Sequence, residues 1–210
     1  MKNAGSLTDL TRRRYNRIAF LYDFMEAPME CLRFASWRQR LTDRIAGPAA
    51  LEVGVGTGKN FAYYPQDVSI TAIDLSPRML ARAQKRANKL NLQPDLREMD
   101  VQHLDFADHS FDTVFATFVF CSVPDPVMGL RELRRVCKPQ GRLLLLEHMR
   151  PGSAVLGFLF DALNPMVVRM MGANINRRTT DNIRQAGWQI RTEINLSADI
   201  VRWIEAKPES

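Results

Sequence analysis

The stretch LEVGVGTG, residues 51–58, decides the fold of this chain. An apolar run that ends at Val53 leads into glycines at every second position, which predicts a buried strand followed by a tight turn and a helix. Glycine lets the backbone approach a ligand closely, and the start of a helix adds backbone N–H donors. The GxGxG spacing differs from the GxGxxG spacing of nicotinamide-binding domains. The loop therefore predicts a ligand site at a strand end.

Acidic residues follow the next two predicted strands. Ile73-Asp74 ends the second apolar run, 20 residues after the first glycine, where a carboxylate can accept both ribose hydroxyls of a nucleoside. Asp100 follows the run 95–99, where its side chain can meet an adenine amino group. The loop 118–123 follows a further strand and falls at the carboxyl edge, where open α/β sheets bind ligands. These strand ends together predict a nucleoside site.

Apolar runs alternate with stretches that repeat apolar residues at helical spacing, which predicts a parallel α/β sheet. Helices are expected over 77–90, with Ser76 as N-cap, and over 126–137, with Asp125 as N-cap. The tail 188–206 predicts two strands joined by a turn. The other strands are expected near 50–53, 68–73, 95–99, 111–115 and 142–146.

Two segments lie outside this alternation. Residues 8–45 predict N-terminal helices with a break near Pro28. The apolar stretch 153–171 contains Asp161 and Pro165, so it is too interrupted to span a bilayer and predicts a pair of surface or lid helices. Both segments are expected to flank the ligand site.

Composition is that of an ordinary soluble globular protein, with 46% hydrophobic and 25% charged residues in 210. This balance excludes wholesale disorder and a polytopic membrane protein. The net charge of +6 favours anionic partners. The cysteines at 31, 121 and 137 form no CxxC pair, which argues against a disulfide framework or zinc site, and no metal cluster is expected. The opening MKNAGSLTDL has no apolar segment, so we expect no secretory signal and a cytoplasmic location.

Taken in order, these motifs resemble the class I S-adenosylmethionine-dependent methyltransferases. The resemblance covers roughly residues 45–150 and rests on LEVGVGTG, AIDLSPRML, MDVQHLDF, FDTVFATFVFCSV and LRELRRVCKPQGRLLLLEH. It implies a Rossmann-like, doubly wound α/β sheet, mostly parallel with an antiparallel C-terminal strand, and a helical cap. It also implies S-adenosylmethionine as cofactor and S-adenosylhomocysteine as product. The expected single domain, 1–210, divides into an N-terminal helical cap (1–45), a cofactor-binding core (46–150), and lid helices with C-terminal strands (151–210).

The resemblance also implies a set of cofactor-binding residues. The glycines would wrap the methionine part, and Asp74 would hold the ribose. Asp100 and Val101 would flank the adenine, and Thr117 or Phe118 would line the sulfonium side. Each role has a structural alternative. The glycines could form a plain strand-to-helix turn, Asp74 could be an N-cap acid, and Met79 could be a core residue. The implied residues are Glu52, Gly54, Gly56, Gly58, Asp74, Leu75, Ser76, Met79, Asp100, Val101 and Thr117.

The stretch 15–23, YNRIAFLYD, resembles the YxxxAxxYD pattern of a subgroup of these enzymes. That subgroup includes quinone C-methyltransferases and small bacterial phospholipid N-methyltransferases. Tyr15 and Tyr22 would then face the cofactor or acceptor, and His148 would take a proton or orient the acceptor. An amphipathic helix with core aromatics and a structural histidine are the alternatives. The quinone enzymes carry a Ser-Gly-His-Arg stretch next, whereas this chain has APMECLRF at 27–34, which favours the phospholipid enzymes.

A lipid acceptor fits the flanking segments. An arginine-rich helix over 11–25 and the apolar segment 153–171 could lie in a membrane interface, or could simply cap the core. On the substrate side we place Phe118, with Arg177 and Arg178 as phosphate ligands; a solvated turn is the alternative for the two arginines. We expect a monomer that methylates the amine of phosphatidylethanolamine and its methylated derivatives at an anionic membrane surface, without nucleic acid. A quinone carbon or a small alkyl thiol is the alternative acceptor.

Two hypotheses that assign the protein to other functional classes remain. A nicotinamide oxidoreductase is disfavoured by the GxGxG spacing and by the absence of a Tyr-xxx-Lys pair. A membrane-binding or nucleic-acid-binding module with a vestigial cofactor site would bind the cofactor without turnover of any acceptor.

Overall fold

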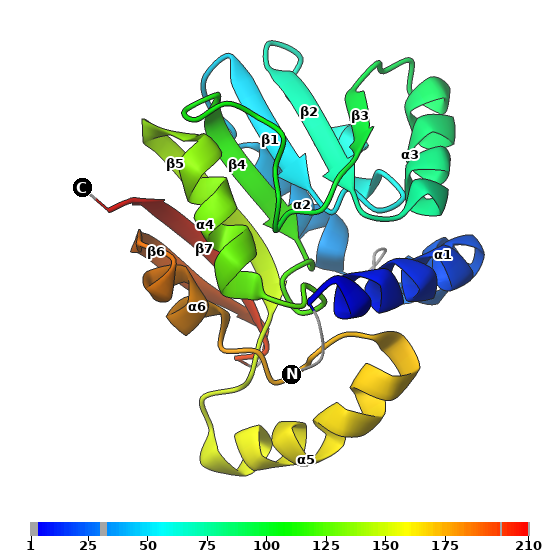
Figure 1. Cartoon of the computed structure of the whole chain (residues 1–210), viewed down its shortest axis with the longest axis vertical. Helices are drawn as coiled ribbons and strands as arrows, with labels where there is room; N and C mark the ends of the chain where they lie inside the picture. Colours follow the sequence, from blue (N-terminus) through cyan, green and yellow to red (C-terminus); the bar gives the residue numbers. More distant parts are fainter. Residues whose placement is uncertain (1–3, 30–32, 198, 210) are drawn as a thin grey trace.

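The computed structural model describes residues 4–29, 33–197 and 199–209, and it describes no side chain at 4–6, 18, 21–29, 170 or 171. Strands of the described chain form one sheet in the order β3-β2-β1-β4-β5-β7-β6 (Figure 1). Their bounds are β1 (Ala49–Val53), β2 (Ser69–Asp74), β3 (Asp95–Glu98), β4 (Phe111–Thr117), β5 (Cys137–His148), β6 (Trp188–Ser197) and β7 (Val201–Pro208).

Strand directions place the ligand crevice. β1 pairs in parallel with β2 and β4, β2 with β3, and β4 with β5. β7 lies between β5 and β6 and is antiparallel to both. The predicted doubly wound, mostly parallel sheet with an antiparallel C-terminal strand is therefore confirmed. The strand order reverses between β1 and β4, and a crevice at the carboxyl ends of strands at such a point is where open α/β sheets bind ligands.

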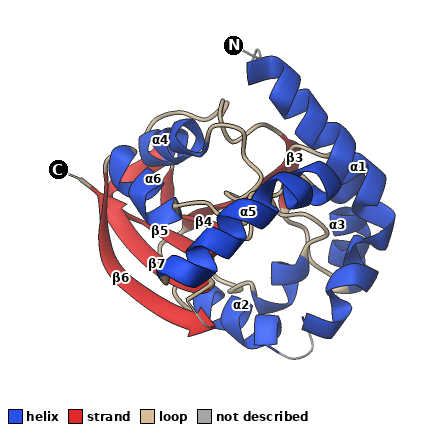
Figure 2. Cartoon of the chain, turned by 90° about the horizontal axis from the view of Figure 1, so that it is seen from below, coloured by secondary structure: helices blue, strands red, loops and turns tan. Residues whose placement is uncertain are grey.

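Helices cover both faces of the sheet (Figures 1 and 2). They are α1 (Ala4–Met29), α2 (Ala35–Thr42), the 3-10 helix η2 (Lys59–Tyr63), α3 (Pro77–Lys89), α4 (Pro126–Val136), α5 (Ala154–Met171) and α6 (Thr179–Gln185). Leu143 and Leu145 of β5 belong to one buried cluster with Leu130 of α4. Leu144 and Leu146 belong to a second cluster on the other face, which includes a side chain of α2. Because alternate residues of a strand point to opposite faces, a continuous apolar run serves both cores.

The predicted helix starts at Ser76 and Asp125 are confirmed. Ser76 Oγ accepts a hydrogen bond from the Met79 N–H at 3.2 Å, and Asp125 Oδ1 accepts one from the Met128 N–H at 2.9 Å. A proline occupies the first turn of both helices. Each cap satisfies an N–H group that has no partner within its helix. α3 thus begins at the end of β2, next to Asp74.

The predicted helix after the glycine loop is present as the five-residue 3-10 helix η2, which begins after Gly58 (φ 78°) and ends before the extended Tyr64. One local prediction was wrong. The segment 153–171 forms the single helix α5 rather than a pair. Pro165 removes one backbone hydrogen bond, but the chain continues in helical form until Gly172, whose φ of 81° ends it.

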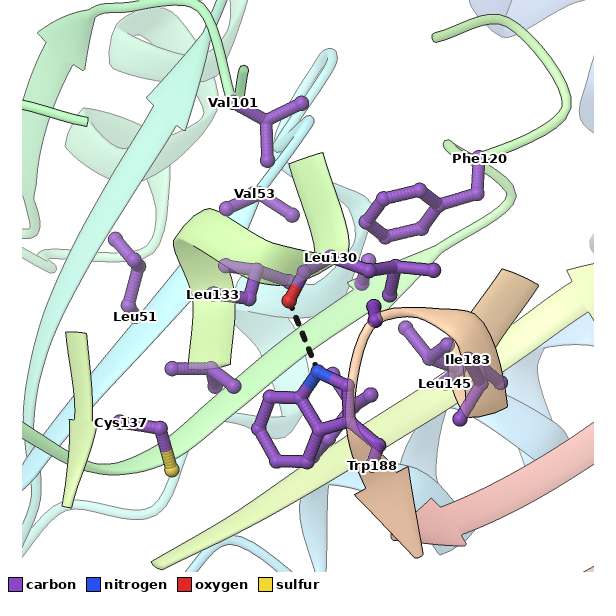
Figure 3. Packing of buried hydrophobic residues seen from close by; sticks show 14 of the residues in the cluster. Leu51, Val53, Val101, Phe120, Leu130, Leu133, Cys137, Leu145, Ile183 and Trp188 are labelled. Carbon is purple, nitrogen blue, oxygen red and sulfur yellow. Dashed lines mark hydrogen bonds between the residues drawn. The ribbon is translucent and has the colours of Figure 1, made fainter. Parts of the chain in front are cut away.

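Trp188 joins the C-terminal strands to the main core (Figure 3). Its indole Nε1–H donates to the backbone oxygen of Leu130 in α4 at 2.9 Å, so the polar atom of this buried ring is satisfied. Leu145 of β5 and Ile183 of α6 belong to the same cluster. β6 and β7 are therefore packed on the same core as the strand that carries the glycine loop.

α1 and α5 both lie at the carboxyl edge of the sheet (Figures 1 and 2). A side chain at Gly172, the C-cap of α5, would meet Arg14 of α1 at 3.0 Å, so the two helices approach one another there. Within the described ranges, neither these helices nor any other has the length and apolar character needed to cross a bilayer. α1 ends at Met29, next to the predicted break at Pro28.

Candidate active site

A pocket lies under α1 at the carboxyl ends of β1, β2, β3 and β4. It is bounded by the glycine loop on one side and by the loop after β4 on the other. Its lining residues are Thr11, Tyr15, Gly54, Gly56, Ile73, Asp74, Leu75, Met79, Met99, Asp100, Val101, Thr117, Phe118, Val119, Ser122, Val123 and Pro124. The fold thus brings together most of the residues that the sequence predicts as cofactor ligands. Among that set, Glu52, Gly58 and Ser76 do not line the pocket.

The glycine loop presents bare backbone to the pocket. Gly54 and Gly56 both have positive φ, at 66° and 56°. A side chain at Gly54 would lie 2.4 Å from Val119 Cγ2, so this glycine allows the loop after β4 to pack directly on the glycine loop. A Cβ added at Gly56 would have the Gly54 oxygen, at 4.0 Å, as its nearest atom, so this position opens into free space. A ligand can approach the backbone there, and a side chain would take its place.

Asp74 places a partly buried carboxylate in the pocket. Its Oδ2 accepts the Gly56 N–H at 2.8 Å, and its Oδ1 accepts the Ser76 N–H at 2.8 Å. Burial raises the pKa of Asp74 to about 6, against the lowering effect of these two hydrogen bonds. Each carboxylate oxygen has a second lone pair, so Asp74 can accept further hydrogen bonds from a diol in the pocket.

Asp100 lies at the other end of the pocket. Gln102 donates to its carboxylate from the backbone N–H at 3.0 Å and from the side-chain amide at 2.9 Å. Thr8 of α1 also donates, at 3.3 Å. Gln102 in turn accepts the Asp125 N–H at 2.9 Å, which links Asp100 to the start of α4. The Asp100 side chain is therefore fixed in place between α1, α4 and the pocket.

α1 closes the pocket through side chains spaced along one face. The Tyr15 hydroxyl is 2.5 Å from Ser122 Oγ in the loop after β4. Asn16 Oδ1 accepts a hydrogen bond from Ser76 Oγ at 2.6 Å, at the start of α3. Together with the contact of Thr8, these bonds fasten α1 across the opening. Tyr22, the other predicted tyrosine, has its side chain outside the described residues.

Comparison with known proteins identifies the family to which this chain belongs. A family model described as "Methyltransferase domain" matches residues 51–145. The phosphatidylethanolamine N-methyltransferase of Cereibacter sphaeroides is 37% identical over 159 residues, which are 74% of this chain and 76% of the relative. The chain belongs to the S-adenosylmethionine-dependent methyltransferases. A demethylmenaquinone methyltransferase of Lactobacillus johnsonii is 29% identical to this methyltransferase over 216 residues, covering 89% of the chain and 88% of the relative.

A solved structure shows the same fold with the cofactor product bound. It is a geranyl diphosphate C-methyltransferase from Streptomyces coelicolor, in complex with Mg²⁺, geranyl diphosphate and S-adenosyl-L-homocysteine. The TM-score is 0.69 at 14% identity, over 82% of this chain and 78% of that one. S-adenosylmethionine is the cofactor of this methyltransferase. The pocket fits it, because the open backbone at Gly56 and the carboxylate acceptor Asp74 suit an amino-acid moiety and a ribose.

Glu52 of this methyltransferase lies beneath the glycine loop, in a buried polar network. Asn60 donates to its Oε1 at 2.6 Å and Tyr64 donates to its Oε2. Arg38 of α2 donates to Thr117 Oγ1 at 2.8 Å and to Asn60 Oδ1 at 3.1 Å. Burial raises the pKa of Glu52 to about 7. The network ties α2, the end of β4 and η2 to the strand that carries the loop, and only Thr117 of its members reaches the pocket.

His148 lies behind the pocket wall of the methyltransferase rather than in its lining. Its ring stacks on Phe118, with centroids 4.5 Å apart at 27°. Phe34 packs on Phe118 at 4.8 Å, and the Arg38 guanidinium lies 5.5 Å from the centre of the same ring. Phe118 itself lines the pocket with a φ of 59°, an uncommon backbone conformation for an aromatic residue. In this geometry the Phe118 ring stands between His148 and the pocket.

Arg177 and Arg178 are also absent from the pocket lining. Arg177 donates to the backbone oxygen of Val123 at 2.7 Å, and so supports the loop after β4 from outside. Desolvation lowers the pKa of the Arg177 guanidinium. Arg178 is exposed at the start of α6. In the part of the chain that the structure describes, no group of three or more His, Cys, Asp or Glu side chains could hold a metal ion.

Several side chains that shape the site escaped the sequence analysis. Arg38 and Asn60 are single polar residues in helical segments, and Tyr64 directly follows η2, so no spacing marks any of the three. Asn16 stands next to Tyr15 in the motif YNRIAFLYD, which is the one signal that could have found it. Gln102 follows Asp100 by two residues, the spacing at which an aspartate accepts a backbone N–H.

Proposed function

We propose that this methyltransferase transfers the methyl group of S-adenosylmethionine to the amine of phosphatidylethanolamine and of its methylated derivatives, at an anionic membrane surface. The observation that carries the lipid part is the exposed apolar face of α5, at the same edge of the sheet as the pocket. The headgroup is chosen by similarity to the phosphatidylethanolamine N-methyltransferase of Cereibacter sphaeroides, which extends over 74% of the chain. The protein would then be cytoplasmic and peripheral to the membrane.

The cofactor supplies a methyl group on a cationic sulfur, which an acceptor can displace directly. The protein has to hold the acceptor in line and exclude water. Asp74 would hold the ribose, Gly54 and Gly56 the methionine part, and Asp100 with Val101 the adenine. Apolar and aromatic pocket residues would exclude water near the reacting atoms.

The acceptor side of the pocket carries the aromatic residues Tyr15 and Phe118. Aromatic faces attract the cationic ammonium of a lipid headgroup. The amine must lose a proton to solvent before it attacks, and the Tyr15 hydroxyl, which is paired with Ser122 Oγ, would then accept a hydrogen bond from the neutral amine and orient its lone pair. We assign Tyr15 this role.

α5 exposes several large apolar side chains. Val155, Phe158 and Met166 are 79%, 74% and 56% exposed. On α1, Arg13, Arg17 and Phe20 are exposed at helical spacing and therefore share one face. α1 and α5 both lie at the carboxyl edge of the sheet (Figure 2). Apolar side chains that insert, next to arginines that meet lipid phosphates, are the composition of an interfacial surface.

A quinone carbon is the second candidate acceptor. The Lactobacillus johnsonii demethylmenaquinone methyltransferase matches a larger share of the chain, 89%, than the phospholipid enzyme does. A lipophilic quinone would also be taken from a membrane, so the α5 face does not separate the two acceptors. A small alkyl thiol is the third candidate acceptor.

Methyl transfer to phosphatidylethanolamine is the first expected result. Purified full-length protein is incubated with methyl-labelled S-adenosylmethionine and one of three acceptors: phosphatidylethanolamine vesicles, a demethylated menaquinone in neutral vesicles, or a small alkyl thiol. We expect label in mono-, di- and trimethylated lipid. Label in the quinone or the thiol, with none in the lipid, would replace the proposed acceptor by that compound.

Weaker membrane binding is expected when the α5 face is made polar. Replacing Phe158 and Met166 by Asp should abolish sedimentation with anionic vesicles, because charged side chains cannot enter the interface. Replacing Arg13 and Arg17 by Ala should weaken binding by about 1 kcal/mol for each arginine at low salt, and less at high salt. Leu90→Asp, at an exposed apolar residue that follows α3, is the matched control. Equal sedimentation of all variants would contradict the docking surface.

A further inference from the structure

Glu147, at the end of β5, holds the turn that follows β4. Its Oε1 accepts the backbone N–H of Val119 at 2.8 Å and that of Phe120 at 3.0 Å. The preceding amide, Phe118 N–H, donates to the Leu146 oxygen at 2.8 Å. Three consecutive amides of the turn are thus held by two consecutive residues of β5. Successive N–H groups that converge on one point form a binding site for an anion, and here the protein supplies the anion itself.

Burial of the Glu147 carboxylate at this position lowers the stability of the fold. Its side chain is fully buried, and its Oε2 has no hydrogen-bond partner among the described residues. Burial raises the pKa of Glu147 to about 7. A fully buried carboxylate destabilises a fold unless its hydrogen bonds compensate for the lost hydration. Fold stability alone therefore does not explain this residue.

The turn that Glu147 holds forms one wall of the pocket. The residues from Phe118 to Pro124 supply five of the pocket-lining side chains. Val119 lies directly against the glycine loop, where its Cγ2 would be 2.4 Å from a side chain at Gly54. Ser122 meets the Tyr15 hydroxyl of α1. Movement of this turn would change both the cofactor loop and the acceptor wall.

We propose that Glu147 is a positioning residue for methyl transfer, whose carboxylate fixes the turn after β4 against the glycine loop and so sets the spacing between the donor and acceptor walls. Direct displacement requires the nucleophile, the methyl carbon and the sulfur to lie in line. A misplacement of about 1 Å can cost on the order of 100-fold in rate, even where both ligands still bind. The residue acts through Val119 and Phe120 and touches neither ligand.

Two variants at this position separate positioning from simple stabilisation. Glu147→Gln keeps one acceptor oxygen for the two N–H groups but removes the charge that strengthens both bonds. Glu147→Ala leaves both N–H groups without an acceptor. We expect kcat to fall about tenfold in the Gln variant and about 100-fold in the Ala variant. The Kd for S-adenosylhomocysteine, measured by calorimetry, should stay within about threefold of wild type in the Gln variant.

Amide hydrogen exchange provides a readout that does not depend on activity. In Glu147→Gln, exchange should accelerate in a peptide over 118–123 and remain unchanged in peptides from β1 and β5. Glu132→Gln is the matched control, because Glu132 accepts the Leu104 N–H at 2.9 Å in a loop outside the pocket lining. That variant should keep its kcat.

The proposal depends on methyl transfer but not on the identity of the acceptor. kcat is measured with whichever compound of the three-acceptor panel the wild-type protein methylates, so failure with phosphatidylethanolamine leaves this test intact. A Gln variant with wild-type kcat would overturn the assignment. So would a loss of kcat that is accompanied by faster exchange throughout the chain, because Glu147 would then be a stabilising residue only. Should the Ala variant not fold, the Gln variant alone decides.

Discussion

Gly54→Ala is expected to abolish measurable binding of S-adenosylmethionine. The new Cβ would lie 2.4 Å from Val119 Cγ2 and 2.8 Å from its Cγ1, at a backbone φ of 66°. The left-handed conformation costs about 1–2 kcal/mol for a residue with a side chain. The overlap adds about 1–3 kcal/mol, or forces one of the two loops to move. Both loops line the pocket, so a binding loss of more than about 100-fold should be seen by calorimetry.

Two further variants test whether the cause is the contact with Val119. Gly56→Ala has a similar φ of 56°, but its nearest atom would be 4.0 Å away, so its melting temperature should fall less than that of Gly54→Ala. Combining Gly54→Ala with Val119→Ala removes the two closest methyl groups and should recover part of the stability. Wild-type affinity in Gly54→Ala, or no recovery in the double variant, would show that the close approach is unimportant.

Asp74→Asn is expected to weaken binding of S-adenosylmethionine by about 100-fold at pH 8. Both Asp74 oxygens accept backbone N–H groups, and an amide can accept at only one of them. The remaining N–H then faces the Asn amide group, which disturbs the glycine loop as well as the proposed ribose contact. Unchanged affinity by calorimetry would remove Asp74 from the cofactor site.

The pH dependence of the same variant has a defined sign. Burial raises the Asp74 pKa to about 6, so donor affinity of the wild type should rise between about pH 5 and 7 as the carboxylate ionises. The Asn variant should lack this rise.

The stability of the fold without donor should depend on pH in the opposite direction. Between about pH 4 and pH 6 the folded chain holds a proton on Asp74 that the unfolded chain has already lost, so the free energy of unfolding of the wild type falls as pH increases over this range. Urea unfolding of both proteins at pH 4.5 and 7 checks this second effect.

The cofactor half of the pocket was largely predictable from the sequence. Its residues sit at strand ends that a short pattern marks, such as the glycines of LEVGVGTG and the acid of AIDLSPRML. Ser76 and Asp125 were predictable because a helix cap is a contact within four residues. In each case the signal and the contact lie close together in the chain.

The remaining features depend on contacts between distant segments. Arg38 reaches Thr117 across 79 positions, and Glu147 reaches Val119 across 28, so neither pairing leaves a local pattern. The positions of Arg177 and His148 behind the pocket follow from the packing of the loop after β4. The single helix at 153–171 was missed because Pro165 is a stop signal in most contexts, and its exposed setting here lets the helix continue.

The fastening of α1 has a consequence for turnover. Thr8, Tyr15 and Asn16 bridge to Asp100, Ser122 and Ser76. We expect exchange of spent for fresh donor to require these bridges to open, since α1 covers the pocket. Each successive methylation of one acceptor needs such an exchange. The outward face of α1 carries Arg13, Arg17 and Phe20. A membrane or partner that binds this face would therefore also change the rate at which the cofactor is exchanged.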